Sequence, residues 1–187
     1  VLTRFVFARH NADIQLHRRF IDDGLILWTG TRATALALFA ELNALCPSIT
    51  LTFEISLTTA IFLDLIIFKG PEYNKHKYLD TKTYQKSVNR YLYTPPTSEH
   101  PPHCQTATVQ TELRRYIKRT TSKADYVSIA TLFLHRLHCR GFPFKFLAKC
   151  FRSAPRFEDR SSLLLPRQST TNTPSIVFAT TFSRQLL

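Results

Sequence analysis

The first part of the chain alternates short apolar stretches with one helical period. Residues 15–28 hold two apolar stretches separated by Asp22, Asp23 and Gly24. Because Asp-Gly is a favoured two-residue turn, this segment is predicted to form a tight β-hairpin with carboxylates at its tip. From Thr31 the apolar residues recur at intervals of three and four, which is the spacing of one helix face, and Pro47 is expected to end that helix.

Three further strands are predicted after Pro47. Apolar and polar residues alternate over residues 49–55, a pattern typical of a half-buried strand. Residues 61–68 form an apolar run that only Asp64 interrupts, and they are predicted to be a second strand. Gly70-Pro71 indicates a turn, and residues 77–84 are expected to form the third strand.

The pattern becomes helical after a linker that contains two Pro-Pro pairs, at residues 95–96 and 101–102. Helices are predicted over residues 106–119, 123–139 and 143–152, with Gly141 ending the second of them. Strands followed by helices indicate an α+β fold. Residues 161–187 contain ten Ser or Thr and no amphipathic period, so a disordered tail is expected there.

The charge of the chain is concentrated in its middle. Among 187 residues, 25 are Lys or Arg and 13 are Asp or Glu, a formal net charge of +12. Residues 1–74 carry six basic and seven acidic side chains, residues 75–160 carry 17 and six, and residues 161–187 carry two and none. This excess excludes acidic-tail and neutral-carrier proteins and favours an anionic partner, such as nucleic acid or a membrane surface.

Several classes of site are excluded by what the sequence lacks. It has four glycines and neither a P-loop nor a GxGxxG motif, which argues against a Gly-rich nucleotide-binding loop. No apolar run approaches the roughly 18 residues of a membrane helix, so no membrane partner is expected. The sequence has no Met and begins at Val1, and we therefore expect it to be a piece of a longer chain.

The cysteines form no CxxC pair, which predicts a reducing, intracellular compartment (nucleus or cytoplasm) rather than a disulfide framework. They are Cys46, Cys104, Cys139 and Cys150. Two groups of residues could together offer four ligands to zinc: His100, His103 and Cys104, and His135, His138 and Cys139. The alternative is that these are surface histidines on basic helices, because the HxxHC spacing is not a recurrent zinc-finger spacing.

Asp22 and Asp23 are the strongest candidates for chemistry. Two adjacent carboxylates repel each other, and a divalent metal ion reverses that balance. Mg²⁺ prefers hard oxygen ligands and keeps several waters, and two such ions can activate a hydroxyl and stabilise a leaving oxygen in phosphoryl transfer. The alternative is a solvated Asp-Asp-Gly turn without a ligand.

The surrounding motifs follow one another in a distinctive order. Residues 18–28 read RRFIDDGLILW; further along are ELNALCP (41–47), ITLTF (49–53), FLDL (62–65), TKTYQKSVNRYL (81–92), SEHP (98–101), ELRR (112–115) and RGFP (140–143). Together these segments resemble reverse transcriptases, most closely the Penelope-like group, which has an aromatic-x-Asp-Asp hairpin followed by motifs of this kind. The resemblance covers residues 18–152 and rests on order and spacing rather than on one motif.

The resemblance implies a partial polymerase palm in residues 1–94, made of a β-hairpin, a helix and antiparallel strands. It implies a helical, helix-turn-helix-like thumb in residues 95–154, and residues 155–187 are left as a disordered tail. Asp22 takes the role of the catalytic metal ligand, with Asp23 as the weaker partner. The family's third catalytic Asp and its fingers lie upstream of this hairpin, and neither Asp13 nor Asp64 is expected to replace that Asp.

The same resemblance implies cofactors and partners. The ion would be Mg²⁺, with Mn²⁺ as a substitute, weakly bound by this pair alone. The partners would be an RNA template and a DNA primer, with deoxynucleotides only in the full-length enzyme. The expected function is a fragment of a retroelement RNA-directed DNA polymerase, which acts by two-metal nucleotidyl transfer and is inactive alone. The alternative is a non-catalytic nucleic-acid-binding module, or a decayed mobile-element remnant in which the Asp pair is a vestige.

The basic middle offers candidate contacts to nucleic acid, because cations neutralise phosphates and aromatic rings stack on bases or sugars. The candidate cations are Lys75, Lys77, Lys82, Lys86, Arg90, Arg114, Arg115, Lys118 and Arg119. The first five interleave with Tyr73, Tyr78, Tyr84, Tyr91 and Tyr93. Contacts of this kind would read little sequence. The alternative is an ordinary solvated helix face, with the tyrosines partly buried in the strands.

Overall fold

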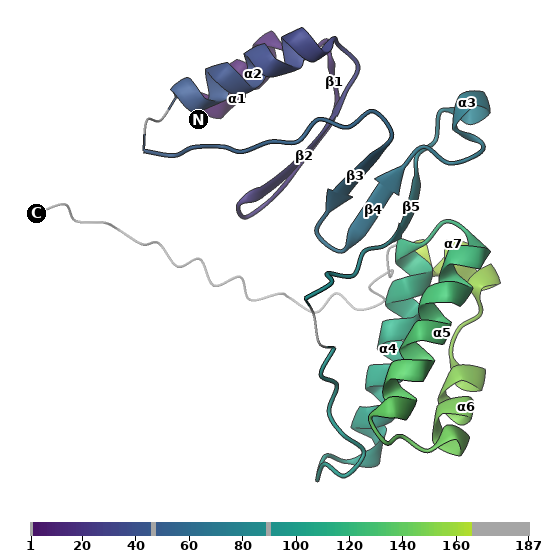
Figure 1. Cartoon of the computed structure of the whole chain (residues 1–187). Helices are drawn as coiled ribbons and strands as arrows, with labels where there is room; N and C mark the ends of the chain where they lie inside the picture. The colour runs from purple at the N-terminus through teal and green to yellow at the C-terminus, as the bar shows by residue number, and fades with distance from the viewer. Residues whose placement is uncertain (1, 46–47, 89–90, 166–187) are drawn as a thin grey trace, which may run out of the picture.

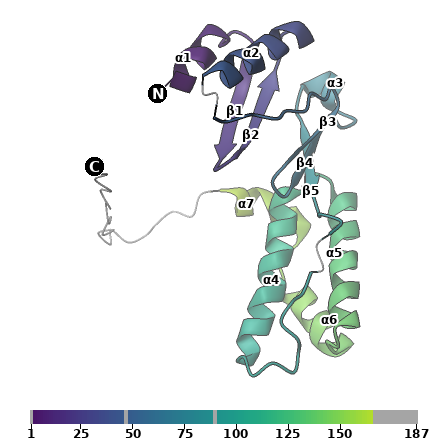
Figure 2. The ribbon, with the colours of Figure 1, turned by 60° about the vertical axis from the view of Figure 1, so that its left-hand side comes forward.

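The computed structural model describes residues 2–45, 48–88 and 91–165. Figures 1 and 2 show three parts that follow one another along the molecule: a hairpin with two helices, a three-stranded sheet, and a group of helices. Both sheets are antiparallel, so the predicted α+β class is confirmed. None of the described helices is long and apolar enough to cross a membrane.

The hairpin and two helices form the first part. Its elements are α1 (Leu2–Arg9), β1 (Ile14–Phe20), β2 (Asp23–Trp28) and α2 (Arg32–Ala44). The predicted helix start is confirmed, since the hydroxyl of Thr31 accepts a 3.2 Å hydrogen bond from the backbone N–H of Thr34. The core here consists of Val6, Leu38 and Leu42, with Ile26 and Trp28 packed against them. The two helices therefore cover the apolar face of the hairpin. The predicted helix-ending Pro47 lies outside the described residues.

The predicted hairpin is confirmed, but its turn lies two residues earlier than the Asp-Gly pair indicates. Phe20 pairs with Asp23, so the loop residues are Ile21 and Asp22. Ile21 has a positive φ of 52°, which a β-branched residue rarely adopts. Arg19 Nε donates a 2.8 Å hydrogen bond to the carbonyl oxygen of Ile21. The register that packs the strands on the helices has overridden the local turn preference.

The middle sheet has the strand order β3–β4–β5. Its strands are β3 (Thr59–Phe62), β4 (Leu65–Phe68) and β5 (Asp80–Thr83), and the short helix α3 (Tyr73–His76) precedes β5. The prediction of one strand over residues 61–68 is wrong, because Leu63 and Asp64 form a turn that divides this run between β3 and β4. The predicted strand over residues 77–84 is confirmed as the shorter β5, and a turn follows Gly70 as expected.

The predicted strand over residues 49–55 is wrong, since this segment pairs with no described strand. Its backbone is held instead by a side chain: the amide of Asn43 accepts a hydrogen bond from Leu51 N–H at 2.7 Å and donates one to its carbonyl at 3.2 Å. Phe53 stacks on Phe39 of α2, with 4.0 Å between ring centroids. Ile49, Leu51 and Phe53 nevertheless remain exposed. The alternating pattern is therefore present here without the buried face and the described neighbouring strand that a sheet requires.

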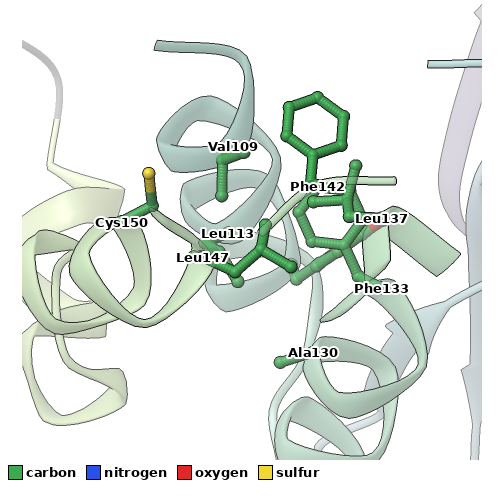
Figure 3. Packing of buried hydrophobic residues seen from close by; sticks show 9 residues of the cluster. Val109, Leu113, Ala130, Phe133, Leu137, Phe142, Leu147 and Cys150 are labelled. Atoms are coloured by element: carbon green, nitrogen blue, oxygen red, sulfur yellow. The ribbon is translucent and has the colours of Figure 1, made fainter. Parts of the chain in front are cut away.

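The third part is helical, as predicted. Its elements are α4 (Pro102–Arg119), α5 (Lys123–Cys139), α6 (Phe144–Ser153), the 3₁₀ helix η1 (Phe157–Asp159) and α7 (Arg160–Leu164). Figure 3 shows the core in which α4, α5 and α6 meet. It contains Val109, Leu113, Tyr116, Ala130, Phe133, Leu137, Phe142, Leu147 and Cys150. Gly141 ends α5 as expected and has φ 91°, a conformation suited to glycine.

The sheet is joined to the helices at the loop between α4 and α5. Thr121 N–H donates a 2.8 Å hydrogen bond to the carbonyl of Thr81 in β5, and Thr81 N–H donates a 3.1 Å bond to the hydroxyl of Thr121. This pair fixes the free edge of β5 against the start of α5, which positions the β3–β4 turn beside α4.

The expected tail is partly ordered. The prediction of a disordered segment from residue 155 onward is wrong for η1 and α7, because both pack back on the helices. Lys123 Nζ pairs with Glu158, and Arg160 Nε donates a 3.1 Å hydrogen bond to the carbonyl of Ile117 at the end of α4. Residues 166–187, on which the rest of that prediction falls, lie outside the described residues.

Candidate functional site

Asp22 and Asp23 lie at the exposed tip of the β1–β2 hairpin. Asp22 is a turn residue and Asp23 is the first residue of β2, so the pairing of Asp23 with Phe20 fixes the backbone that carries both carboxylates. Neither carboxylate has an ion pair or hydrogen bond to another residue in the described part of the chain. Two adjacent hard-oxygen donors that form no ion pair with the described residues are a suitable setting for a hydrated divalent ion.

The residues that surround this pair fit only a weakly held ion. The described segments contain no group of three or more His, Cys, Asp or Glu side chains that could bind a metal. Asp13 lies at the opposite end of the hairpin, where its carbonyl accepts a 2.9 Å hydrogen bond from Thr29 N–H. Asp22 and Asp23 would therefore supply two carboxylate ligands, and water would complete the coordination shell.

Asp64 has a different environment from the Asp pair, although it also lies at a hairpin turn. Its carboxylate Oδ2 is 2.8 Å from Arg119 Nη2 and 3.5 Å from Arg115 Nη2, both on α4. Its carbonyl accepts a 2.8 Å hydrogen bond from Tyr84 N–H, just after β5. Arg115 also pairs with Glu112 on the same helix. Asp64 thus joins the sheet to α4 through ion pairs with two arginines.

The basic residues of the middle part are distributed over two surfaces. Lys75 belongs to α3, Lys77 follows it, and Lys82 and Lys86 lie in and after β5. Two of them lie over aromatic rings: Lys77 Nζ is 5.5 Å from the centroid of Tyr73, and Lys82 Nζ is 5.1 Å from that of Phe68. Arg90 lies outside the described residues.

On α4 the four predicted cations divide into two pairs. Arg114 and Lys118 are exposed on one face. Arg115 and Arg119 turn toward the β3–β4 turn, where they pair with Asp64. Of these four residues, Arg114 and Lys118 can contact phosphates without breaking an ion pair, whereas Arg115 and Arg119 cannot. The sequence pattern alone does not separate the two pairs.

The Arg115–Arg119 pair lines an open pocket of about 440 Å³ between α4 and the segment that follows β5. The lining includes residues 83–86 and 91–93, together with Asp64, Glu112, Arg115, Tyr116 and Arg119. Our sequence reasoning missed this pocket, because its walls come from segments far apart in the chain. The run of tyrosines interleaved with cations was the available signal.

Two tyrosines at this pocket are held within the helical core. Tyr93 and Tyr116 share a hydrogen bond, and burial raises the pKa of both phenols, with that of Tyr116 the more strongly raised. Both rings also contact Phe133 edge to face, at centroid distances of 5.2 and 5.6 Å. The rings of Tyr93 and Tyr116 therefore form a rigid part of the pocket wall.

Arg18 and Arg19 lie next to the Asp pair on β1 and were not assigned a role from the sequence. Both are exposed. Their charges, after the larger effect of burial, lower the pKa of His17. The hairpin tip therefore presents cations and carboxylates side by side.

The two groups proposed as zinc ligands are not assembled into one site within the described residues. His135 and Cys139 are neighbours on α5, with 3.6 Å between Nε2 and Sγ. His100 is hydrogen-bonded to Ser98 in the linker, and Cys46 lies outside the described residues.

No family model, curated protein or solved structure matches this chain.

Proposed function

We propose that this chain supplies the Asp-Asp hairpin of the palm and the thumb-like helices of a reverse transcriptase, and that it contacts an RNA template and a DNA primer. The observation that carries the proposal is the hairpin tip, where Asp22 and Asp23 are exposed on a fixed turn and form no ion pair with another described residue. The order of the elements supports it, since a hairpin, a helix, antiparallel strands and a basic helical part follow one another as the family resemblance implies.

In this proposal Asp22 holds Mg²⁺ and Asp23 assists. Bound ions of this kind activate an attacking hydroxyl and stabilise a leaving oxygen in phosphoryl transfer. The fold of the chain fixes where the two carboxylates lie, because the β1–β2 pairing and the hydrogen bond from Arg19 to the carbonyl of Ile21 hold the turn. The resemblance implies that a third carboxylate and the nucleotide-orienting residues come from palm and fingers segments that the described residues do not supply.

Nucleic-acid contacts would come from the exposed cations. Arg114 and Lys118 lie one helical turn apart on α4, a spacing that lets both reach phosphates of one backbone. Lys75, Lys77 and Lys86 are exposed around the middle sheet. Such contacts position a duplex and carry little sequence information.

A second candidate function is a non-catalytic nucleic-acid-binding module. The observation that favours it is that, among the described residues, only Asp22 and Asp23 gather at the hairpin tip, whereas Asp64 forms ion pairs with Arg115 and Arg119. Two-metal catalysis needs ligands from two separate strands, so the described residues do not complete such a centre. In this alternative Asp22 and Asp23 would be a vestige with no affinity for metal ions.

Binding of Mn²⁺ separates the two candidates. Mn²⁺ is titrated into the chain, and the free ion is followed by electron paramagnetic resonance. We expect weak binding, with a dissociation constant on the order of 1 mM, because only two carboxylates hold the ion. Asp22→Asn should abolish the binding, because the amide removes the charge that holds the ion. Asp64→Asn is the matched control and should leave it unchanged. Equal binding by all three proteins, or none by the unaltered chain, would favour the non-catalytic module.

Primer extension tests the enzyme assignment itself. The chain alone should not extend a primer on an RNA template with Mg²⁺, whereas a chimera carrying the upstream palm and fingers of a Penelope-like reverse transcriptase should. In the chimera Asp22→Asn should remove activity and Asp64→Asn should mainly reduce stability. Full activity of the Asp22→Asn chimera would contradict the assignment of the hairpin.

A further inference from the structure

The pocket beside α4 combines features that the proposed metal site does not use. It lies between the β3–β4 turn, the segment after β5 and α4, and its volume of about 440 Å³ falls within the range of small-molecule sites. Its charged lining residues are Lys86, Arg115 and Arg119 against Asp64 and Glu112, which leaves one positive charge in excess. An anion is therefore the preferred occupant.

The two arginines already hold an anionic group at one end of the pocket. Both guanidinium groups meet the same oxygen, Oδ2 of Asp64, at 2.8 Å for Arg119 and 3.5 Å for Arg115. The side chain of Asp64 is 54% exposed, so the pair is open to solvent and is held only weakly. A phosphate group carries more charge and three acceptor oxygens, and arginines bind it in a bidentate manner.

The remaining walls suit an aromatic ring. Tyr84, Tyr91 and Tyr93 line the pocket, and the ring of Tyr93 is fixed by its contacts with Tyr116 and Phe133. Thr83 also lines the pocket, and its hydroxyl is buried without a hydrogen-bond partner in the structure. This hydroxyl is closed to solvent, so Thr83 contributes its exposed surface to the pocket wall rather than a hydrogen bond to an occupant.

We propose that this pocket binds a mononucleotide unit, with the phosphate on Arg115 and Arg119 and the base against the tyrosines. Asp64 competes with that phosphate for the two arginines and so sets the affinity. The unit can be a free nucleotide or the 5′-phosphorylated end of a nucleic acid, since both present the same groups. The proposal depends neither on metal binding at Asp22 nor on duplex binding at Arg114 and Lys118.

Adenosine monophosphate is the probe, and its binding to the full chain is measured by isothermal titration calorimetry, with adenosine and inorganic phosphate for comparison. The monophosphate should bind more tightly than either part. Arg119→Gln should weaken binding by about tenfold or more, because it removes a charge-assisted hydrogen bond to phosphate. Asp64→Asn should strengthen binding by about two- to fivefold, because it removes the competing carboxylate.

Arg114→Gln is the matched control: it removes one charge from the same helix outside the pocket, and binding should be unchanged. Circular dichroism and melting of each variant show that it is folded. If Arg114→Gln weakens binding as much as Arg119→Gln, or if Asp64→Asn weakens it, the pocket is not the site. The same conclusion follows if adenosine monophosphate binds no more tightly than adenosine to the unaltered chain and to Asp64→Asn.

Competition experiments then identify the source of the nucleotide unit. A 5′-phosphorylated oligonucleotide that displaces the monophosphate, where its 5′-hydroxyl counterpart does not, places a nucleic-acid end in the pocket. Displacement by neither oligonucleotide supports a free nucleotide. Displacement by both to the same extent would contradict the proposal, because the backbone rather than the phosphate end would then be recognised.

Discussion

At the residue scale, both hairpins use the same unusual turn. Ile21 and Leu63 have φ values of 52° and 55°, and in each loop the next residue is an aspartate. An aliphatic residue in this conformation costs about 1–3 kcal/mol, so the surrounding pairing must hold it. No sequence rule marks Ile or Leu for such a position, which explains why the first turn was predicted two residues late and the second was not predicted. The aspartates themselves were identifiable from the sequence.

A substitution at Gly70 tests how tightly the loop between β4 and α3 packs against β5. A Cβ atom at this position would overlap the carboxylate of Asp80 in β5, whereas one at Gly24 would meet nothing within 4 Å. Gly70→Ala should therefore lower the free energy of unfolding by about 1–3 kcal/mol through overpacking. Gly24→Ala is the control and should change it by less than about 0.5 kcal/mol. Urea unfolding measures both, and equal effects would show that Asp80 moves aside freely.

At the element scale, the helices were predicted far better than the strands. A helix satisfies its own hydrogen bonds, so the apolar period of α2, α4, α5 and α6 was a sufficient signal, together with the N-cap Thr31 of α2. A strand needs a partner, and residues 49–55 show the alternation without one. The backbone N–H and carbonyl of Leu51 are hydrogen-bonded to Asn43, and the ring of Phe53 stacks on Phe39. The packing of η1 and α7 was also missed, because it depends on contacts such as that of Arg160 with Ile117.

The core of α4 gives a pH-dependent prediction. Burial raises the pKa of Tyr116 above its ordinary value of 10.0, so the folded chain keeps this proton to a higher pH than the unfolded chain does. The contribution of this protonated phenol to the free energy of unfolding is therefore fully present below about pH 10 and is lost as the pH rises further. Tyr116→Phe should cost about 1 kcal/mol at pH 7 through the lost hydrogen bond to Tyr93.

The same substitution should flatten the fall of the melting temperature between pH 9 and pH 11, measured by circular dichroism. Tyr78→Phe is the control, since Tyr78 is 77% exposed and its hydroxyl is in water in both states. An unchanged pH profile in Tyr116→Phe would mean that other groups, rather than this phenol, govern alkaline unfolding.

At the scale of the whole molecule, the sequence shows which residues carry charge, but it does not predict which of them form ion pairs or line the same pocket. The Asp pair could be found because its two residues are adjacent in the chain. Asp64 is 51 and 55 residues from the two arginines that it meets, and its partners depend on the docking of Thr81 against Thr121. The pocket next to them could not be predicted for the same reason, although the tyrosines and cations that line it had been noted.

The charge of residues 75–160 predicts nucleic-acid binding that falls steeply with salt. Neutralising about five phosphates would give a slope of log affinity against log salt of about −4 to −5, with similar affinity for unrelated sequences. The structure refines which residues of α4 contribute. Arg114 and Lys118 are exposed, whereas Arg115 and Arg119 must first leave Asp64, and Arg115 must also leave Glu112.

The double variant Arg114→Gln/Lys118→Gln should therefore make the slope shallower by about 1.8, the share of two phosphate contacts at 0.9 each. Arg115→Gln/Arg119→Gln, which removes the same charge from the same helix, should change the slope by less than half of that amount. Filter binding of a double-stranded oligonucleotide between 50 and 300 mM salt measures both slopes. A slope near zero for the unaltered chain would exclude phosphate-driven binding. Equal changes in the two variants would show that the ion pairs with Asp64 open readily, so that all four cations of α4 act as one surface.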